Sequence, residues 1–393
     1  MTTKNLIAGL RPEWQLLLAC CRRPTPPGDS ERVRGLLVPG LDWASLLRLA
    51  EEQGVAPLVV QALRDAGEDR VPESWQERLR EQARSRVRFT LALVAELFRL
   101  LEILGQAGIE TAVFKGPALA VEAFDDAALR QYSDLDLFVP HAQALHACDA
   151  LLACGYRTEL PLEEARRGRA PGQFLFTRRG ALAAIELHTE RTLRYVPRPL
   201  PVDALLARRS WVSIEGHRVP AFSAEDTLVL ISVHGSKHMW DRLALVADMG
   251  ALACRVPPLD ARAAIGFARE LGAERMLAVG LRLASDLLAA PLPEEFSRHA
   301  EQNVPSRRLC RRVETRLLGE DGGQAGILGR AWFRIRMRGG LLAGVPYLLR
   351  LVLAPTEEDW GGGNGPNRSG LGATIRRPLR LLRKYGLGFG RRA

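Results

Sequence analysis

Two aspartates lie one residue apart in the stretch RQYSDLDLFVP, residues 130–140. The apolar residues around them are typical of a buried strand. Residues i and i+2 of a strand point to the same face, so Asp134 and Asp136 project side by side, with Cα atoms about 6.5–7 Å apart. Two carboxylates at this spacing can bind one or two hard cations, and Mg²⁺ favours carboxylate together with phosphate oxygens. Without a cation the charges repel, which raises the pKa of one carboxyl. The alternative is a strand with one solvent-exposed face.

A second acidic strand is predicted at AAIELHTE, residues 183–190. Its alternation puts Glu186 and His188 on one face, with apolar residues on the other. Glu186 is therefore a candidate third carboxylate beside the aspartate pair. A D-x-D strand next to an acidic strand is an arrangement that suits two-metal phosphoryl transfer, so we expect a divalent-metal site here.

A basic and glycine-containing segment precedes both strands. Residues 110–116, ETAVFKG, predict a short buried strand, and Pro117 suits the first turn of the helix that follows. Gly116 lets the backbone approach a ligand closely, and a helix N-terminus favours anions. Lys115 adds a positive charge at the same place. Lysine is rare in this chain, and Lys115 and Lys237 are two of only four.

The elements that must position these residues follow from periodicity. Residues 1–107 have apolar residues at three- and four-residue spacing and predict helices, the last of them ended by Gly105 and Gly108. Residues 110–220 alternate strands with helices and are typical of a compact α/β unit on a mixed sheet. Within this unit, residues 172–190 predict a hairpin with an Arg-Arg-Gly turn.

Helices resume at Ser223, which forms a predicted capping box with Asp226. His234 and His238 follow four residues apart, so they share a helix face. That spacing can bind zinc, and contact with phosphate or acceptor, helix capping and simple packing are the alternatives. Asp248 can orient Arg242, or it can pack between helices as a hydrogen-bonded polar group.

The bulk composition limits the class of protein. No apolar run reaches the ~18–20 residues that cross a bilayer, and the first residues do not form a secretory signal. The six cysteines show no C-x-x-C pair and predict reduced core residues of a cytoplasmic protein. The net charge of +10 is concentrated in residues 301–393, and residues 375–393 hold seven basic residues and no acid. This tail is either a solvated end or a weak contact for an anionic surface such as nucleic acid or a membrane. The glycine-rich residues 360–372 lack the spacing of a phosphate-binding P-loop.

The ordered motifs together resemble the core of the DNA polymerase beta-like nucleotidyltransferase superfamily, most closely a large bacterial group of uncharacterised nucleotidyltransferases. In that group a Lys-Gly pair precedes R-x-x-S-D-h-D-h-h-V, where h is an apolar residue. A strand ending in an acid, an apolar residue and His follows, and then a helical H-x-x-K … R-L … D motif. The matching residues are Lys115, Gly116, Arg130, Ser133, Asp134, Asp136, Glu186, His188, His234, Lys237, Arg242, Leu243 and Asp248. One departure is that Pro117 follows Gly116, where the superfamily usually has a Gly-Ser or Gly-Gly pair closer to the aspartates.

This resemblance implies a reaction. A nucleoside monophosphate group would pass from a nucleoside triphosphate to an acceptor, with release of pyrophosphate and with Mg²⁺ or Mn²⁺ as cofactor. Asp134, Asp136 and Glu186 would be catalytic and hold the metal, and Glu186 would also help to deprotonate the acceptor hydroxyl. The residues implied for nucleotide binding are Lys115, Gly116, Arg130, Ser133, His188, His234, Lys237 and Arg242. A sugar, a lipid carrier and a peptide are all open as acceptors.

We therefore expect an α+β fold with a mixed-sheet nucleotidyltransferase core at residues 108–222. A helical region, 1–107, would precede it, and a second helical region, 223–300, would complete the site before the basic segment 301–393. Two other functions stay open. The chain can be a non-catalytic member of the same fold that binds nucleotide or nucleic acid, or a metal-dependent phosphohydrolase that uses the same carboxylates.

Overall fold

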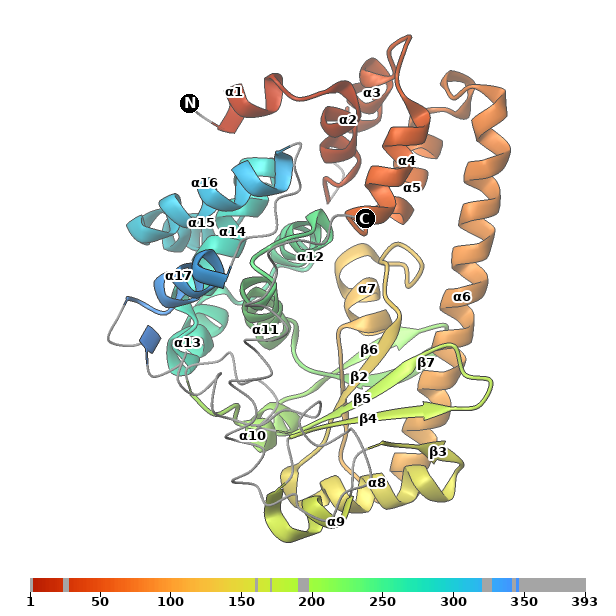
Figure 1. Ribbon diagram of the computed structural model, residues 1–393, viewed down its shortest axis with the longest axis vertical. Helices are drawn as coiled ribbons and strands as arrows, with labels where there is room; N and C mark the ends of the chain where they lie inside the picture. Colours follow the sequence, from red (N-terminus) through yellow and green to blue (C-terminus); the bar gives the residue numbers. More distant parts are fainter. Residues whose placement is uncertain are drawn as a thin grey trace.

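The computed structural model describes residues 3–23, 28–159, 162–169, 172–189, 198–319, 327–340 and 344–345. Helices make up its N-terminal part, as the periodicity predicts. They are α1 (Thr3–Ala8), α2 (Pro12–Cys20), α3 (Asp29–Leu36), α4 (Trp43–Glu52), α5 (Ala56–Ala66), the 3₁₀ turn η1 (Glu68–Arg70) and α6 (Glu73–Gln106). Figure 1 shows the long α6 running along one side of the molecule. Gly105 is the penultimate residue of α6, and Gly108, with a φ of +69°, turns the chain after the helix.

One mixed sheet follows in the described part of the chain. Its strands are β1 (Ala112–Phe114), β2 (Asp134–Phe138), β3 (Tyr156–Arg157), β4 (Gln173–Arg178), β5 (Ala184–His188), β6 (Ser210–Ile214) and β7 (His217–Ala221). Their order is β3-β4-β5-β2-β1-β7-β6. The pairs β2–β5 and β1–β7 are parallel, and the other neighbours are antiparallel. The predicted hairpin is formed by β4 and β5, which pair in antiparallel register.

The two faces of the sheet contact different helices. On the face that we call the back face, Leu135 and Leu137 of β2 are buried in one core with Leu97 of α6 and Leu151 of α8 (Ala144–Ala153). The front face carries Asp134 and Asp136 and is turned toward α11 (Ala224–Lys237) and α12 (Leu243–Ala253). The alternation of β2 therefore separates an apolar face from an acidic one, because successive side chains point to opposite sides.

The remaining helices lie between the strands or after them. Those between the strands are α7 (Gly116–Phe124), η2 (His141–Gln143), α8, α9 (Leu162–Glu164), the π turn η3 (Ala165–Arg169) and α10 (Val202–Ala207). Those after the sheet are α11, α12, α13 (Ala261–Leu271), α14 (Glu274–Leu288), α15 (Glu294–Gln302), α16 (Val304–Leu318) and α17 (Ile327–Met337). Helix α14 packs against α11, α12, α15 and α16, and this bundle lies on the side of the molecule opposite α6 (Figure 1).

Helix α11 is capped at its start, and the turn that follows it is held by a buried side chain. At its start, the Ser223 hydroxyl accepts a hydrogen bond from the Asp226 backbone N–H at 3.1 Å. The Asp226 carboxylate binds Arg208 instead of returning to the cap, so the capping box is only half formed. Beyond its end, Trp240 is fully buried, and a Cβ added to Gly235 or Gly280 would lie 2.7 Å from the Trp240 ring. Small residues are therefore needed where the ring packs, and the turn delivers α12 to the front face.

The α+β fold with helical flanks is confirmed. The strands lie between residues 112 and 221, while the exact division of the chain into domains stays a prediction. All six cysteines are free thiols, and five are buried as expected. Cys154 is exposed, so the core prediction is wrong there, because this residue follows the last turn of α8 at the surface. None of the described helices is both long and apolar enough to cross a membrane. The glycine-rich residues 360–372 and the basic tail 375–393 lie outside the described residues.

Candidate active site

Strand pairing brings the predicted acidic residues together on the front face. Strands β2 and β5 run in parallel with Asp136 opposite Glu186. The same register places His188 opposite Phe138, and the two rings stack with centroids 5.0 Å apart. On the other side of β2, Phe114 of β1 is opposite Asp136, so Lys115, the next residue, lies beside the acids.

The closest contacts involve the imidazole of His188. Its Nε2 donates a hydrogen bond to Asp136 Oδ1 at 2.6 Å and lies 3.4 Å from Glu186 Oε2. One ligand atom each from Asp136, Glu186 and His188 lies within 4.8 Å of the others, so this group can hold a metal ion. The sequence predicted Asp134 as the third metal ligand. The structure groups His188 with the other two instead, and it places Asp134 on the same face, opposite Ala184.

The two aspartates differ in their electrostatic surroundings. Burial alone would raise the pKa of Asp136, but Lys115, whose Nζ lies 3.7 Å away, and His188 outweigh it and hold this pKa well below its usual range. Burial likewise opposes the charged form of His188, yet its contacts with Asp136 and Glu186 raise the pKa of the imidazole. Burial and repulsion by Asp136 raise the pKa of Asp134. One of the two carboxyls thus has a raised pKa, as the spacing predicts.

Lys115 is held in an unusual backbone conformation. Its φ of +59° lies in the left-handed region that favours glycine, and Gly116 follows with a φ of +49°. Such a conformation in a non-glycine residue costs about 1–3 kcal/mol and is concentrated at functional sites. The Lys115 side chain is only 13% exposed, and burial lowers the pKa of its ammonium group despite the neighbouring Asp136. The backbone is therefore bent at the point where it turns the lysine toward the acids and begins α7.

A cavity of about 430 Å³ separates the acidic front face from helices α11 and α12. We call it the acidic cavity. Ten of the eleven residues predicted for the site line it, and Gly116 is the exception. Those ten are Lys115, Arg130, Ser133, Asp134, Asp136, Glu186, His188, His234, Lys237 and Arg242. Asp134, Asp136 and Glu186 thus line the sheet side of the cavity, next to Lys115. The cationic side chains of Lys237 and Arg242 line its helical side.

A family model described as uncharacterised nucleotidyltransferase matches residues 39–289, more than half of the 393-residue chain. The chain belongs to this nucleotidyltransferase family. The match runs from α4 to α14 and includes every strand of the described sheet. No protein of curated function matches the chain. The family supports nucleotidyl transfer as the general activity, and the group of Asp136, Glu186 and His188 supports a divalent metal.

In this member of the family, the rings of His234 and His238 lie next to each other, with centroids 4.6 Å apart. Burial and the nearby lysines lower the pKa of His238 to about 4 and the pKa of His234 well below its usual value. Both imidazoles are therefore neutral at physiological pH. Within the described ranges, no third metal-binding residue joins the pair, so the zinc alternative gains no support.

Arg130 has a partner that the sequence did not predict. Its Nε donates to both carboxylate oxygens of Asp248, at 3.1 and 3.0 Å, and the two side chains are 12% and 5% exposed. The expectation that Asp248 orients Arg242 is therefore wrong. Asp248 is a hydrogen-bonded polar group, as the alternative had it, but its partner lies in a loop and not on a second helix. Arg242 precedes the first turn of α12 and has an extended backbone, with φ −133° and ψ 142°, so helical periodicity does not pair it with Asp248. The ion pair connects α12 to the loop before β2.

Gln173 of β4 also contacts the predicted site residues, and the sequence did not indicate it. Its Nε2 donates to Glu186 Oε2 at 2.7 Å, which orients this carboxylate. The predicted hairpin was the available signal, because antiparallel pairing puts Gln173 opposite His188, next to Glu186 on the same face. His238, Asp241 and Asp248 also line the acidic cavity.

Proposed function

We propose that this nucleotidyltransferase moves a nucleoside monophosphate group from a nucleoside triphosphate to an acceptor hydroxyl and releases pyrophosphate. The observation that supports this most strongly is the acidic cavity, in which Asp134, Asp136 and Glu186 face Lys237 and Arg242. A triphosphate needs both features, because cationic side chains bind its oxygens and carboxylates bind the metal that accompanies it.

The donor set fits Mg²⁺ or Mn²⁺. Carboxylate oxygens from Asp134, Asp136 and Glu186 are the ligands that these hard cations prefer. His188 donates to Asp136, and Gln173 donates to Glu186, so each of these two carboxylates is oriented by a neighbour, as is usual around metal sites. When bound, a divalent ion would neutralise negative charge on the phosphates and on the transferred phosphoryl group.

The residues of the chain have distinct parts in the proposed step. Lys115, Arg130, Lys237 and Arg242 hold phosphate oxygens, and Ser133, His234 and His188 complete the nucleotide contacts. The acceptor oxygen forms a bond to the α-phosphorus, and the bond from that phosphorus to the bridging oxygen breaks. Pyrophosphate leaves with the bonding electron pair, and the hydroxyl proton passes to the Glu186 carboxylate.

Metal-dependent hydrolysis by the same carboxylates is the second candidate, with water as the attacking group. One observation favours it. The carboxylates and cations of the acidic cavity could act on the oxygen of water as well as on that of an acceptor hydroxyl. The two candidates differ in their products, since transfer labels the acceptor and hydrolysis releases a free nucleotide.

The test combines binding with product analysis. Mg²⁺ with a non-hydrolysable triphosphate should raise the melting temperature of the parent protein, because a ligand that binds only the folded state stabilises it. Asp134→Asn, Asp136→Asn and Glu186→Gln should lose most of this rise, while Glu102→Gln, an exposed change on α6, should keep it. Incubation with α-labelled triphosphates then shows whether label reaches an acceptor. If all three variants shift as the parent does, the proposed metal and nucleotide site is wrong.

A further inference from the structure

Helices α16 and α17 present charge of one sign at the surface. Helix α16 holds five arginines, α17 holds three, and the one acidic residue of the two helices is Glu314. Glu314 is only 3% exposed and accepts a hydrogen bond from the Thr3 hydroxyl. The exposed arginines are Arg307, Arg308, Arg311 and Arg312 of α16 and Arg336 of α17. We call these five residues, together with Trp332 of α17, the arginine surface.

The arginine surface is continuous across the two helices. At about 100° per residue, the four exposed arginines of α16 lie within an arc of about 140°. Trp332 and Arg336 are four positions apart, so they share a face of α17. The guanidinium carbons of Arg312 and Arg336 lie 4.5 and 5.5 Å from the centroid of the Trp332 ring, which is a cation–π arrangement. Both helices lie on the side of the molecule away from α6 (Figure 1).

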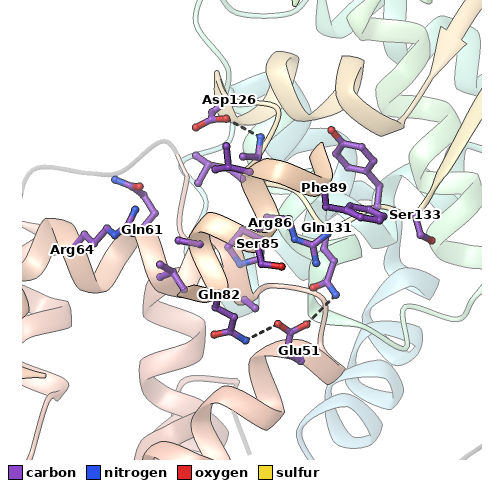
Figure 2. Close-up of a pocket in the computed structure, with 18 of the residues that line it drawn as sticks. Glu51, Gln61, Arg64, Gln82, Ser85, Arg86, Phe89, Asp126, Gln131 and Ser133 are labelled. Atoms are coloured by element: carbon purple, nitrogen blue, oxygen red, sulfur yellow. Dashed lines mark hydrogen bonds between the residues drawn. The ribbon is translucent and has the colours of Figure 1, made fainter. Parts of the chain in front are cut away.

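Other arginine-rich parts of the molecule also carry acids. On α6, Arg84 pairs with Glu77 at 3.1 Å and Arg88 pairs with Glu81 at 2.7 Å. A groove of about 490 Å³ between α4, α5, α6 and the loop before β2 is likewise of mixed charge (Figure 2). Its charged residues are Arg64, Arg86, Arg242, Glu51 and Asp126. Among the residues that the structure describes, by contrast, none of the five arginines of the arginine surface forms an ion pair.

The like charges of the arginine surface repel one another. Arg307 with Arg311, and Arg308 with Arg312, form i,i+4 pairs of the same sign, which destabilise a helix. The repulsion extends to Arg316 in the next turn, where burial and the neighbouring arginines lower the pKa of the guanidinium group. A bound anion would relieve this repulsion, so the surface favours an anionic partner.

The chemistry of the arginine surface suits a nucleic acid better than a membrane. The apolar faces of both helices are buried in the core, with Leu309, Val313 and Phe333 among their residues. In the described parts of α16 and α17, the exposed large apolar side chains are Val304 and Trp332 alone. A helix that binds a membrane inserts an apolar face, which these helices do not offer. Guanidinium groups, however, match phosphate oxygens in pairs, and aromatic and guanidinium planes stack on bases.

We propose that the arginine surface binds a nucleic acid through its phosphate backbone, with the Arg312–Trp332 stack against a base. RNA and DNA share this backbone, so both are probes in the test. The arginine surface lies outside residues 39–289, which match the family model, and none of its residues lines the acidic cavity. The proposal therefore does not depend on nucleotidyl transfer.

The test is fluorescence anisotropy of the full chain with labelled strands of about 20 nucleotides at ~0.1 M salt. The probes are single-stranded RNA, single-stranded DNA and duplex DNA of mixed sequence, and at least one should bind. The triple variant Arg308→Gln, Arg311→Gln, Arg312→Gln should weaken this binding about tenfold or more. It should also lower the slope of log affinity against log salt by about 2, because each lost phosphate contact removes ~0.7–0.9.

The matched control is the triple variant Arg78→Gln, Arg84→Gln, Arg88→Gln on α6. It removes the same charge from exposed positions, and the Arg78 guanidinium also lies over a tryptophan ring, that of Trp75, at 5.2 Å. This control should bind within about twofold of the parent. Both triple variants keep residues 375–393, so the basic tail contributes equally to each.

Thermal melts show that each variant is folded, and flotation with phosphatidylserine vesicles tests the membrane alternative. The proposal is overturned if no strand binds, or if the vesicles bind and nucleic acid does not. It is also overturned if the α16 variant binds nucleic acid as the parent does, since the tail would then carry the binding. An equal loss in the α6 control would likewise overturn it. The melting shift with Mg²⁺ and a non-hydrolysable triphosphate should be the same in both variants as in the parent, and it reports separately on the proposed nucleotide site.

Discussion

Two groups of charged side chains lie on opposite faces of the sheet. On the back face, Glu96 of α6 accepts hydrogen bonds from the Tyr156 hydroxyl at 2.7 Å and from Arg178 at 3.0 and 2.6 Å. Both carboxylate oxygens have donors, and one negative charge meets one positive charge. Burial would raise the pKa of Glu96, but the hydrogen bonds from Arg178 and Tyr156 outweigh it and lower this pKa. We call these three residues the back cluster.

The front face is charged in a different way. There, the carboxylates Asp134, Asp136 and Glu186 line the acidic cavity close to the ammonium group of Lys115 and the imidazole of His188. Asp136 is well compensated, whereas the pKa of Asp134 is raised by burial and by its neighbour. The back cluster is therefore complete without a ligand, while the front face keeps negative charge that a cation would balance. The contacts of the back cluster are complete within the fold, and the incompletely compensated charge of the front face supports the proposal that this face binds a ligand.

The largest expected contrast is in activity. Asp134→Asn, Asp136→Asn and Glu186→Gln should each lower pyrophosphate release about 10²–10³-fold, because each removes a charge proposed to hold the metal. Glu96→Gln should stay within about twofold of the parent. Steady-state assays of pyrophosphate release at saturating triphosphate measure this. An equal loss in Glu96→Gln would remove the functional distinction between the two faces.

The second contrast is in stability, to which we expect the back cluster to contribute more than the front face. Glu96→Gln should lower the free energy of unfolding by about 2 kcal/mol at pH 7, because charged hydrogen bonds are lost. The folded pKa of Glu96 lies below its ordinary value of 4.5, so its stabilisation is present above that pH and is lost as the pH falls through the folded pKa. Urea unfolding at pH 7 and pH 3.5 should show a smaller difference at the lower pH. Glu102→Gln, exposed on the same helix, is the control, and a pH-independent difference would contradict the assigned cause.

The third prediction concerns the ion pair between Arg130, in the loop before β2, and Asp248 of α12. Asp248→Asn should raise the KM for triphosphate about tenfold and change kcat less, because Arg130 loses the partner that positions its guanidinium. Asp248→Glu should restore part of the loss, since it keeps the charge. Steady-state kinetics of the three proteins with varied triphosphate give both constants. A fall in kcat with an unchanged KM would show that the pair does not act on nucleotide binding.

The smallest effect separates the two aspartates of the front face. In metal-free buffer at pH 7, Asp134→Asn should raise the free energy of unfolding by roughly 1 kcal/mol and Asp136→Asn should lower it by a similar amount. The folded pKa of Asp134 is raised, so its charge destabilises the fold above that pKa. The folded pKa of Asp136 is lowered, so its stabilisation is present above the unfolded value of about 3.8 and is lost as the pH falls through the folded pKa. Thermal melts with a chelator measure both, and changes of the same sign would refute this assignment.

Much of the candidate site could be read from local patterns. The period of two placed Asp134 and Asp136 on one face of β2, and it placed Glu186 and His188 on one face of β5, the second strand of the predicted hairpin. The parallel pairing of β5 with β2 is a tertiary contact that these patterns did not determine. Such patterns depend only on backbone geometry, which repeats over a few residues. The prediction failed for Asp248, because its partner Arg130 is 118 positions away and no periodicity connects them.

The sequence by itself determined which residues are proposed to carry the chemistry and which faces of strands and helices present them, because residue type and spacing act locally. Only the tertiary structure decided the partners of these residues. It set Lys115 and His188 against Asp136, and it brought Gln82 and Gln131 to Glu51 in a groove that no motif indicates. Contacts of this kind form where separate segments pack, so they depend on the arrangement of the whole chain and not on the order of neighbouring residues.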